Sequence, residues 1–310
     1  MKRFALVLVL VLAVTLPSFC VPLATSARAA IPFDVQQIIC VDYRALKDSP
    51  TALALKARVL PDNIKEFEES LRSTGIYPDK DVDQLSFTSF RANKKLHIIG
   101  IAQGQFSTKA VLAKLKKSKA KAEKYRLSDI YPMSGGQSMV FLDDFTLLFG
   151  QKDAVKAALD ARDGEAQSLA SNSTITDQIG SVQDGAVWSV LDQSGTENML
   201  QSTLGDAAKL ADYDVIKKRL VASRYTMDFN NGVKFNLNVV TSDSMTAATL
   251  ASLLKAGVLF RKMGATGSEK LALDSVTVDN SSSNLTLLFK TDDKQFQSLL
   301  SSPLFAAVSK

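Results

Sequence analysis

The run Thr-Leu-Leu-Phe occurs twice in this chain, about half the chain length apart. The first copy spans residues 146–149 and the second spans residues 286–289, and each closes an apolar segment with the composition of a strand. Each copy leads into a stretch with helical spacing, residues 152–159 and 292–300. A weaker match lies upstream, where residues 85–90 correspond to 224–229 at nearly the same spacing. A repeat of this size predicts two similar modules in one chain.

Both modules show the element order strand–helix–strand–strand–helix–strand, followed by a further strand or hairpin and a helix. The predicted strands are 35–43, 82–91, 94–103, 124–133, 138–142 and 145–149 in the first module, and 186–191, 218–229, 233–241, 271–278 and 284–290 in the second. The main predicted helices are 107–117, 197–210 and 244–263. This order is that of the ferredoxin-like split βαβ fold, βαββαβ, with an added hairpin and helix.

The expected fold class is therefore α+β, with two pseudo-repeated modules that each cover an antiparallel sheet with helices. The predicted division is a signal peptide at 1–30, a first module at 31–165, a connecting segment at 166–185 and a second module at 186–310. The connecting segment is rich in Ser, Gln, Asn and Asp, a composition typical of loops. The sequence leaves open whether the modules share one continuous sheet or form a closed pair.

The first 30 residues have the pattern of an export signal. Lys2 and Arg3 precede an apolar stretch at 4–16, and Ala27-Arg28-Ala29 supplies the small residues that a signal peptidase recognises. We expect cleavage near Ala29, after that residue or the next, and an extracytoplasmic protein, periplasmic or secreted. Two alternatives stay open: lipidation at Cys20, although a bulky residue precedes it, and retention of the apolar stretch as an anchor. No transmembrane segment is expected once the signal is removed.

Removal of the signal changes the charge balance. The full chain has 37 basic and 32 acidic groups, and loss of Lys2, Arg3 and Arg28 leaves a net charge of only +2. So small a surplus predicts no general attraction to nucleic acid.

A hairpin at residues 141–150 carries a family resemblance. There, Asp143-Asp144 joins two strands, the second strand begins Phe145-Thr146-Leu147, and Gly150 precedes an Ala-rich helix. Tyr125 and Tyr131 lie in the strand before it. Over about residues 120–165 the chain resembles a group of uncharacterised secreted bacterial proteins that share this strand–Asp-Asp-x-Thr-Leu–strand motif. The resemblance implies an α+β fold and an export route, and it implies no activity.

Residue types suited to catalysis are scarce. His97 is the single histidine and lies in an apolar predicted strand, where packing is its expected role. Cys40 is the only cysteine left after signal removal, in an apolar run where we expect it to be buried. The acidic pairs at 143–144 and 292–293 lie where aspartates form turns and helix starts. We therefore expect no enzyme, metal site or cofactor.

A cluster of lysines is the one strong departure from an otherwise balanced distribution of charge along the chain. Residues 109–126 contain eight basic groups and one acidic group. If the predicted helix extends beyond residue 117, one face carries Lys114, Lys117, Lys121 and Lys124. This face is either a solvated surface or a contact for an anionic partner such as lipid headgroups, a cell-wall polymer or an acidic protein.

Export, duplication and the shortage of catalytic residues together favour a non-enzymatic extracytoplasmic binding or structural protein. Its ligand is unknown, and the lysine-rich face is the expected contact with an anionic envelope component or protein. The alternative is a carrier or sensor of an apolar small molecule held between sheet and helices, which requires a true cavity. An enzyme that uses carboxylates ranks third, because no acid–base pair can be named.

Overall fold

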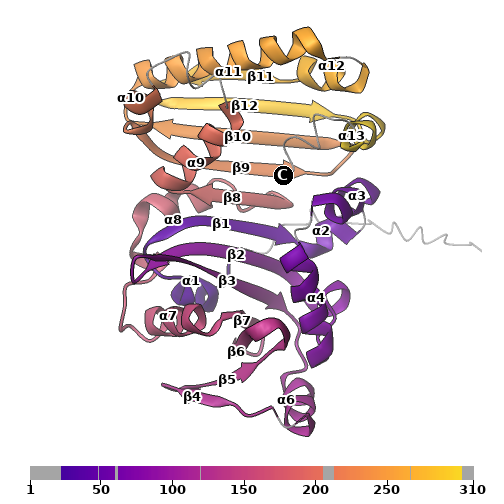
Figure 1. Cartoon of the computed structure of the whole chain (residues 1–310), viewed down its shortest axis with the longest axis vertical. Coiled ribbons are helices and arrows are strands. Elements are labelled where there is room, and N and C mark those ends of the chain that lie inside the picture. The colour runs from indigo at the N-terminus through magenta and orange to yellow at the C-terminus, as the bar shows by residue number, and fades with distance from the viewer. Residues whose placement is uncertain are drawn as a thin grey trace, which may run out of the picture.

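A computed structural model of the chain describes residues 22–47, 49–59, 62–118, 120–204, 213–265 and 267–301. These residues form one α+β structure around a single antiparallel sheet of twelve strands (Figure 1). The strands are β1 (Val35–Asp42), β2 (Val82–Ala92), β3 (Lys95–Gly104), β4 (Glu123–Tyr125), β5 (Ser128–Pro132), β6 (Gln137–Asp143), β7 (Thr146–Gln151), β8 (Val187–Leu191), β9 (Leu220–Asp228), β10 (Val233–Thr241), β11 (Thr277–Ser281) and β12 (Asn284–Thr291).

Helices lie over the sheet and at the ends of its strands. They are α1 (Thr25–Ala30), α2 (Tyr43–Lys47), α3 (Pro50–Val59), α4 (Asp62–Thr74), α5 (Pro78–Asp81), α6 (Thr108–Lys117), α7 (Lys152–Arg162), α8 (Ser173–Gly180), α9 (Gln193–Leu204), α10 (Tyr213–Lys217), α11 (Ser244–Gly264), α12 (Gly267–Asp274) and α13 (Asp293–Leu300). Short 3₁₀ turns occur at Ser134–Gly136 and Leu169–Ser171. The end of the predicted helix at 197–210 lies outside the described residues.

The question of one sheet or two has a clear answer. The strand order is β11-β12-β10-β9-β8-β1-β2-β3-β7-β6-β5-β4, so β1 and β8 pair at the centre and join both halves of the chain in one continuous sheet. Outward from that pair, the first half runs β1-β2-β3-β7-β6 and the second runs β8-β9-β10-β12-β11. Numbered by their order along the chain, the strands of each half therefore lie in the sequence first, second, third, last and next-to-last. In the first half, β5 and β4 extend the sheet beyond β6.

The predicted ferredoxin-like order is wrong. In that fold a crossover helix would place the first strand beside a parallel neighbour. Here β1 pairs antiparallel with both β2 and β8. The reason is visible in Figure 1, where α2, α3 and α4 stay at the end of the sheet at which β1 stops. The connection therefore returns the chain at the same end, and the adjacent strand runs in the opposite direction.

The predicted strand at 124–133 is also corrected. Arg126 has a φ of 51°, a left-handed conformation that ends β4, and the chain reverses before β5. Two short strands therefore replace one longer strand at this edge of the sheet.

The predicted strand pairs 82–91 with 94–103 and 218–229 with 233–241 are joined by short turns, as their bounds imply. Asn93 and Lys94 have φ values of 51° and 62° and join β2 to β3. In the second half, Gly232 (φ 107°) follows Asn231 and leads into β10. A Cβ at Gly232 would lie 2.1 Å from the Thr291 carbonyl oxygen, so only glycine fits this turn without a shift.

One row of directly opposed residues crosses the sheet and shows how its faces are covered. Opposed residues of neighbouring strands point to the same side of a sheet. The row runs Val140, Leu148, Ile101, Ser86, Cys40, Trp188, Thr226, Asn236, Leu288, Thr277. We call the side to which it points the Leu148 face and the opposite side the Leu147 face.

The Leu148 face is covered over the first half and over β8, the first strand of the second half. The row is fully buried from Val140 to Trp188, where α1, α7 and α8 pack on it. Beyond Trp188 the residues become polar and partly exposed, and Leu288 is 38 % exposed. Cys40 is buried in this core, as predicted.

The Leu147 face carries helices in both halves. In the first half α4 and α6 bury Leu147 and Phe149. In the second half, α9 and α11 form one cluster around Leu250 and Leu285. The helices α3, α12 and α13 form another around Phe296. The helix after β7 therefore packs on the Leu148 face, whereas the helix after β12 packs on the Leu147 face.

Residues 22–30, which the sequence assigns to the signal peptide, are partly folded into this structure. Helix α1 packs against α7, and Leu23, Ala27 and Ala30 are buried. The hydroxyl groups of Ser26 and Thr146 are 3.0 Å apart. Residues 1–21, with the charged and apolar parts of the predicted signal and Cys20, lie outside the described residues. Cleavage near Ala29 stays a prediction, and its consequence for stability is tested below.

Candidate functional site

The predicted lysine cluster lies at the β4 end of the sheet, on α6, on β4 and on the segment between them (Figure 1). Helix α6 begins after Ser107, as predicted, and buries Val111 and Leu115 against the Leu147 face. We define the lysine end as the described lysines of this region, all of them exposed: Lys109, Lys114, Lys116, Lys117, Lys121 and Lys124.

The predicted helical face of four lysines is only half formed. Helix α6 ends at Lys117, so Lys114 and Lys117 share a helix, whereas Lys121 lies in an irregular segment and Lys124 on β4. The stem of Lys114 lies over Gly75, 3.4 Å from where a Cβ of that glycine would stand. The lysines therefore form a broad basic surface rather than one stripe.

The acidic groups beside the lysine end already have other partners. Glu123 accepts from Lys152 and from Lys156, at 2.8 Å, and these hydrogen bonds hold the pKa of its carboxyl below the ordinary value. Asp160 pairs with Arg126 at 2.6 Å. Among the described residues, no carboxylate is within ion-pair distance of a lysine of the lysine end. Its positive charge is therefore not neutralised by these neighbours.

Part of this charge has a local structural reason. Lys114, Lys116 and Lys117 occupy the last turn of α6, where the helix dipole favours cations. Lys121 and Lys124 lie beyond the helix, and that reason does not apply to them.

The other residues considered for chemistry have structural roles in this arrangement. His97 on β3 stacks on Phe90, with ring centroids 5.7 Å apart. Asp143 accepts a hydrogen bond from the Phe145 N–H at 2.8 Å and so forms the predicted turn. Asp292 caps α13 by accepting from the Gln295 N–H at 2.7 Å. Among the described residues no group of His, Cys, Asp or Glu could hold a metal ion.

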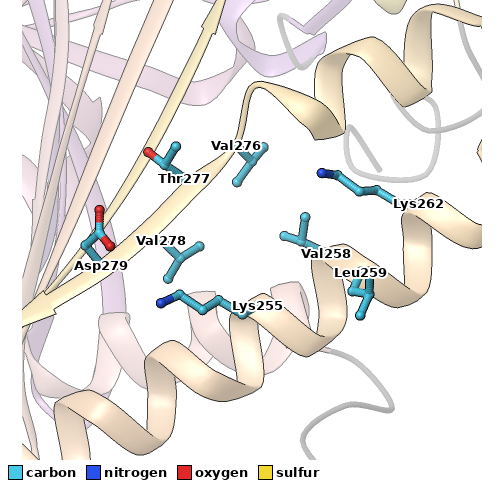
Figure 2. A pocket seen from close by; sticks show the side chains of 8 residues that line it. All are labelled: Lys255, Val258, Leu259, Lys262, Val276, Thr277, Val278 and Asp279. Atoms are coloured by element: carbon cyan, nitrogen blue, oxygen red, sulfur yellow. The ribbon is translucent and has the colours of Figure 1, made fainter.

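A second candidate site lies at the opposite end of the sheet, where sequence reasoning predicted nothing. It is a groove of about 430 Å³ between α11 and β11 (Figure 2). The residues that line it are Lys255, Val258, Leu259, Lys262, Val276, Thr277, Val278 and Asp279. The sequence offers one hint, the apolar residues at the end of α11, which include Phe260 and Met263 and which are exposed in the structure. Helical periodicity alone could not reveal it, because α11 has many apolar positions and only packing decides which are covered.

No protein-family model matches this chain, and no curated protein matches it. Solved structures of TP0453 are similar in fold. Crystal form I gives a TM-score of 0.48 at 7 % identity and covers 92 % of this chain and 98 % of that chain. Form III gives 0.43 at 6 % identity, with coverage of 88 % and 97 %, and form IV gives 0.42 at 7 % identity, with 89 % and 96 %. The functional proposals therefore rest on this chain's own residues.

Proposed function

We propose that this protein is a non-enzymatic, extracytoplasmic binding or structural protein that contacts an anionic partner through the lysine end. The observation that supports this most strongly is the imbalance of charge there. Six exposed lysines have no described carboxylate partner, while the nearby acidic groups are bound by Lys152, Lys156 and Arg126. A concentrated, solvent-facing charge attracts anions from a distance, and this attraction weakens as salt rises.

The position outside the cytoplasm is part of the same proposal. It rests on Lys2 and Arg3, the apolar stretch after them and the small residues around Ala29. Within the described residues no helix is long and apolar enough to cross a membrane.

The two halves are proposed to be a structural repeat. Their matching strand order supports it, and both Thr-Leu-Leu-Phe runs fall on the strand beside the third strand of their half, β7 next to β3 and β12 next to β10. The opposite placement of α7 and α13 limits the repeat to the sheet. Superposition of the five matched strands, without helices, is the direct check, and a poor fit of β7 on β12 would contradict it.

The alternative function, a carrier of an apolar small molecule, has weaker support. Such a ligand needs an enclosed apolar chamber. The groove at α11 is open and carries Lys255 and Lys262 at its sides. This composition suits a partner that docks on the surface better than a molecule that is enclosed.

The proposal is tested with a variant in which Lys114, Lys117, Lys121 and Lys124 are all replaced by Glu. We expect the wild-type chain to bind immobilised heparin at low salt and the variant to elute at much lower salt, because the attraction is electrostatic. Capture of anionic material from an envelope extract should fall in the same way.

The matched control replaces four exposed lysines of the second half, Lys218, Lys234, Lys290 and Lys294, by Glu. The change of net charge is identical, so an equal loss of binding in the control would show that overall charge, not the lysine end, binds the polyanion. Unchanged binding by the first variant would exclude the lysine end as the contact.

A further inference from the structure

The two ends of the sheet are differently protected. β11 ends the sheet on one side and pairs with β12 alone, and β4 ends it on the other side. The edge at β4 is only three residues long, and Glu123 on it is bound by Lys152 and Lys156. The edge at β11 is five residues long. An unpaired strand edge presents backbone N–H and C=O groups to any chain that can lie beside it.

The hairpin register tells which groups of β11 face outward. Ser281 lies opposite Asn284, so two residues form the turn between β11 and β12. In such a hairpin the closing pair, and every second residue from it, directs its backbone groups to the partner strand. Val278 and Asn280 therefore direct their N–H and C=O groups away from β12, toward the open edge.

The groove follows this edge. On the helix side it is lined by Lys255, Val258, Leu259 and Lys262, which share one face of α11 at the spacing i, i+3, i+4, i+7. On the strand side it is lined by four consecutive residues, 276–279. Thr277, Val278 and Asp279 belong to β11, where consecutive residues point to opposite faces, so a groove that touches all three runs along the backbone edge rather than over one face. Figure 2 shows helix and strand lining the groove from its two sides.

Charge and exposure indicate what the groove accepts. Lys255 is exposed and has no described carboxylate within ion-pair distance, whereas Lys262 pairs with Asp274 at 2.9 Å. Three large apolar residues near the end of α11 face solvent, Leu259 at 64 %, Phe260 at 78 % and Met263 at 82 % exposed. Asp279, the other charged residue of the lining, follows Val278, which packs toward α11, and therefore points to the opposite face of the strand. On the α11 side, a matching occupant has an extended backbone for β11, an acidic side chain for Lys255 and apolar side chains for α11.

We propose that β11 and α11 form a docking site for an extended, acidic segment of a partner protein, which adds to the sheet as a further strand. Main-chain hydrogen bonds to the β11 edge supply affinity, as in other cases of strand addition, and α11 supplies selectivity. The site lies at the other end of the sheet from the lysine end, so it stands or falls independently of the function proposed above.

The test uses the full chain and a short, fluorescent synthetic peptide with the repeat Glu-Thr-Val-Thr, which places glutamate and valine on the same face of an added strand. A twin peptide carries N-methyl groups on the backbone nitrogens of alternate residues and cannot form the ladder. We expect saturable anisotropy changes with the first peptide and none with the twin. Lys255→Glu should weaken binding about fivefold or more by placing like charges together. The matched control Lys290→Glu, on the exposed side of β12, should leave binding unchanged.

Leu259→Asp is a second variant. Because Leu259 is exposed, we expect this variant to keep the fold and to bind the peptide more weakly. Absence of saturable binding to the wild-type chain, or equal binding of the twin, overturns the proposal. Sedimentation that shows a dimer lost in Leu259→Asp, without peptide binding, would make a second copy the occupant. Binding to phosphatidylglycerol vesicles through Phe260 and Met263, again without peptide binding, would make a lipid surface the occupant. Either result overturns the proposed partner class.

Discussion

The two halves of the sheet share a strand order but not a core. Leu148 and Leu288 are the third residues of the two Thr-Leu-Leu-Phe runs and lie in the same row of opposed residues. Leu148 is 0 % exposed, because α1 and α7 cover it, whereas Leu288 is 38 % exposed. The first half is thus a three-layer structure and the outer part of the second half has two layers. The burial of each leucine therefore depends on which face of the sheet the next helix covers, α7 after β7 or α13 after β12.

The sharpest way to break this comparison is to replace each leucine by alanine. Leu148→Ala should lower the free energy of unfolding by about 4 kcal/mol, because it leaves a cavity beneath closely packed helices. Leu288→Ala should cost less than about 1 kcal/mol, because much of its side chain already contacts water. Urea denaturation of both variants measures the difference. Equal costs would show that the Leu148 face is covered in both halves.

The role of α1 in this asymmetry is tested by two versions of the chain, one that starts at Pro22 and one that starts at Ile31. Loss of α1 uncovers Leu23, Ala27 and Ala30 and the surface of α7 beneath them. We expect the shorter chain to be less stable by about 3 kcal/mol, from the apolar burial that it lacks. Mass spectrometry of the protein purified from its native cells then tells which version the cell makes. Equal stability of both versions would show that α1 adds nothing to the core.

The smallest expected effect concerns pH and the hairpins that end each half. The β6–β7 turn contains Asp143, whereas the β11–β12 turn is formed by Ser282 and Ser283. Burial raises the pKa of the Asp143 carboxyl, but hydrogen bonds from Ser26 and from the Phe145 and Thr146 backbone outweigh it and hold that pKa below its ordinary value.

A carboxyl whose pKa is lower in the folded state stabilises the fold above its unfolded pKa, near 4, and the stabilisation is lost as pH falls through the folded pKa. Because Asp143 is largely exposed and screened by solvent, we expect less than about 1 kcal/mol. Asp143→Asn should reduce the loss of stability between pH 5 and pH 3 in denaturation experiments, and Ser282→Ala should leave it unchanged. Identical pH profiles for Asp143→Asn and the wild type would exclude this contribution.

Local features of the fold were predictable from the sequence. Asp292 caps α13 and Asn93 marks the first hairpin turn, because caps and turns depend on residues close together in the chain. Ser107 precedes α6 as expected, but its side chain makes no capping hydrogen bond. The continuous sheet, the non-ferredoxin order and the covering of its faces were not predictable. They depend on the pairing of β1 with β8 and on where α7 and α13 pack, and local hydrophobic periodicity predicts neither.

The candidate sites likewise have a part that the sequence predicts and a part that depends on long-range packing. The exposure of Lys114, Lys117, Lys121 and Lys124 could be expected from composition, and the structure shows it. Their shared helical face could not, because α6 stops after Lys117. The groove beside β11 forms between α11 and residues 276–279, which only the folded structure brings together, so no sequence motif predicts it.

The central pairing of β1 with β8 has a consequence for how the chain folds as it is synthesised. β1 is the first strand in the chain, and its partner at residues 187–191 follows only after the whole first half has emerged. Until then the apolar strand at the middle of the final sheet has an open edge, which is the kind of surface that aggregates or recruits a chaperone. Such long-range closure slows folding. A strand that is paired on both sides in the finished molecule therefore has an exposed edge during synthesis.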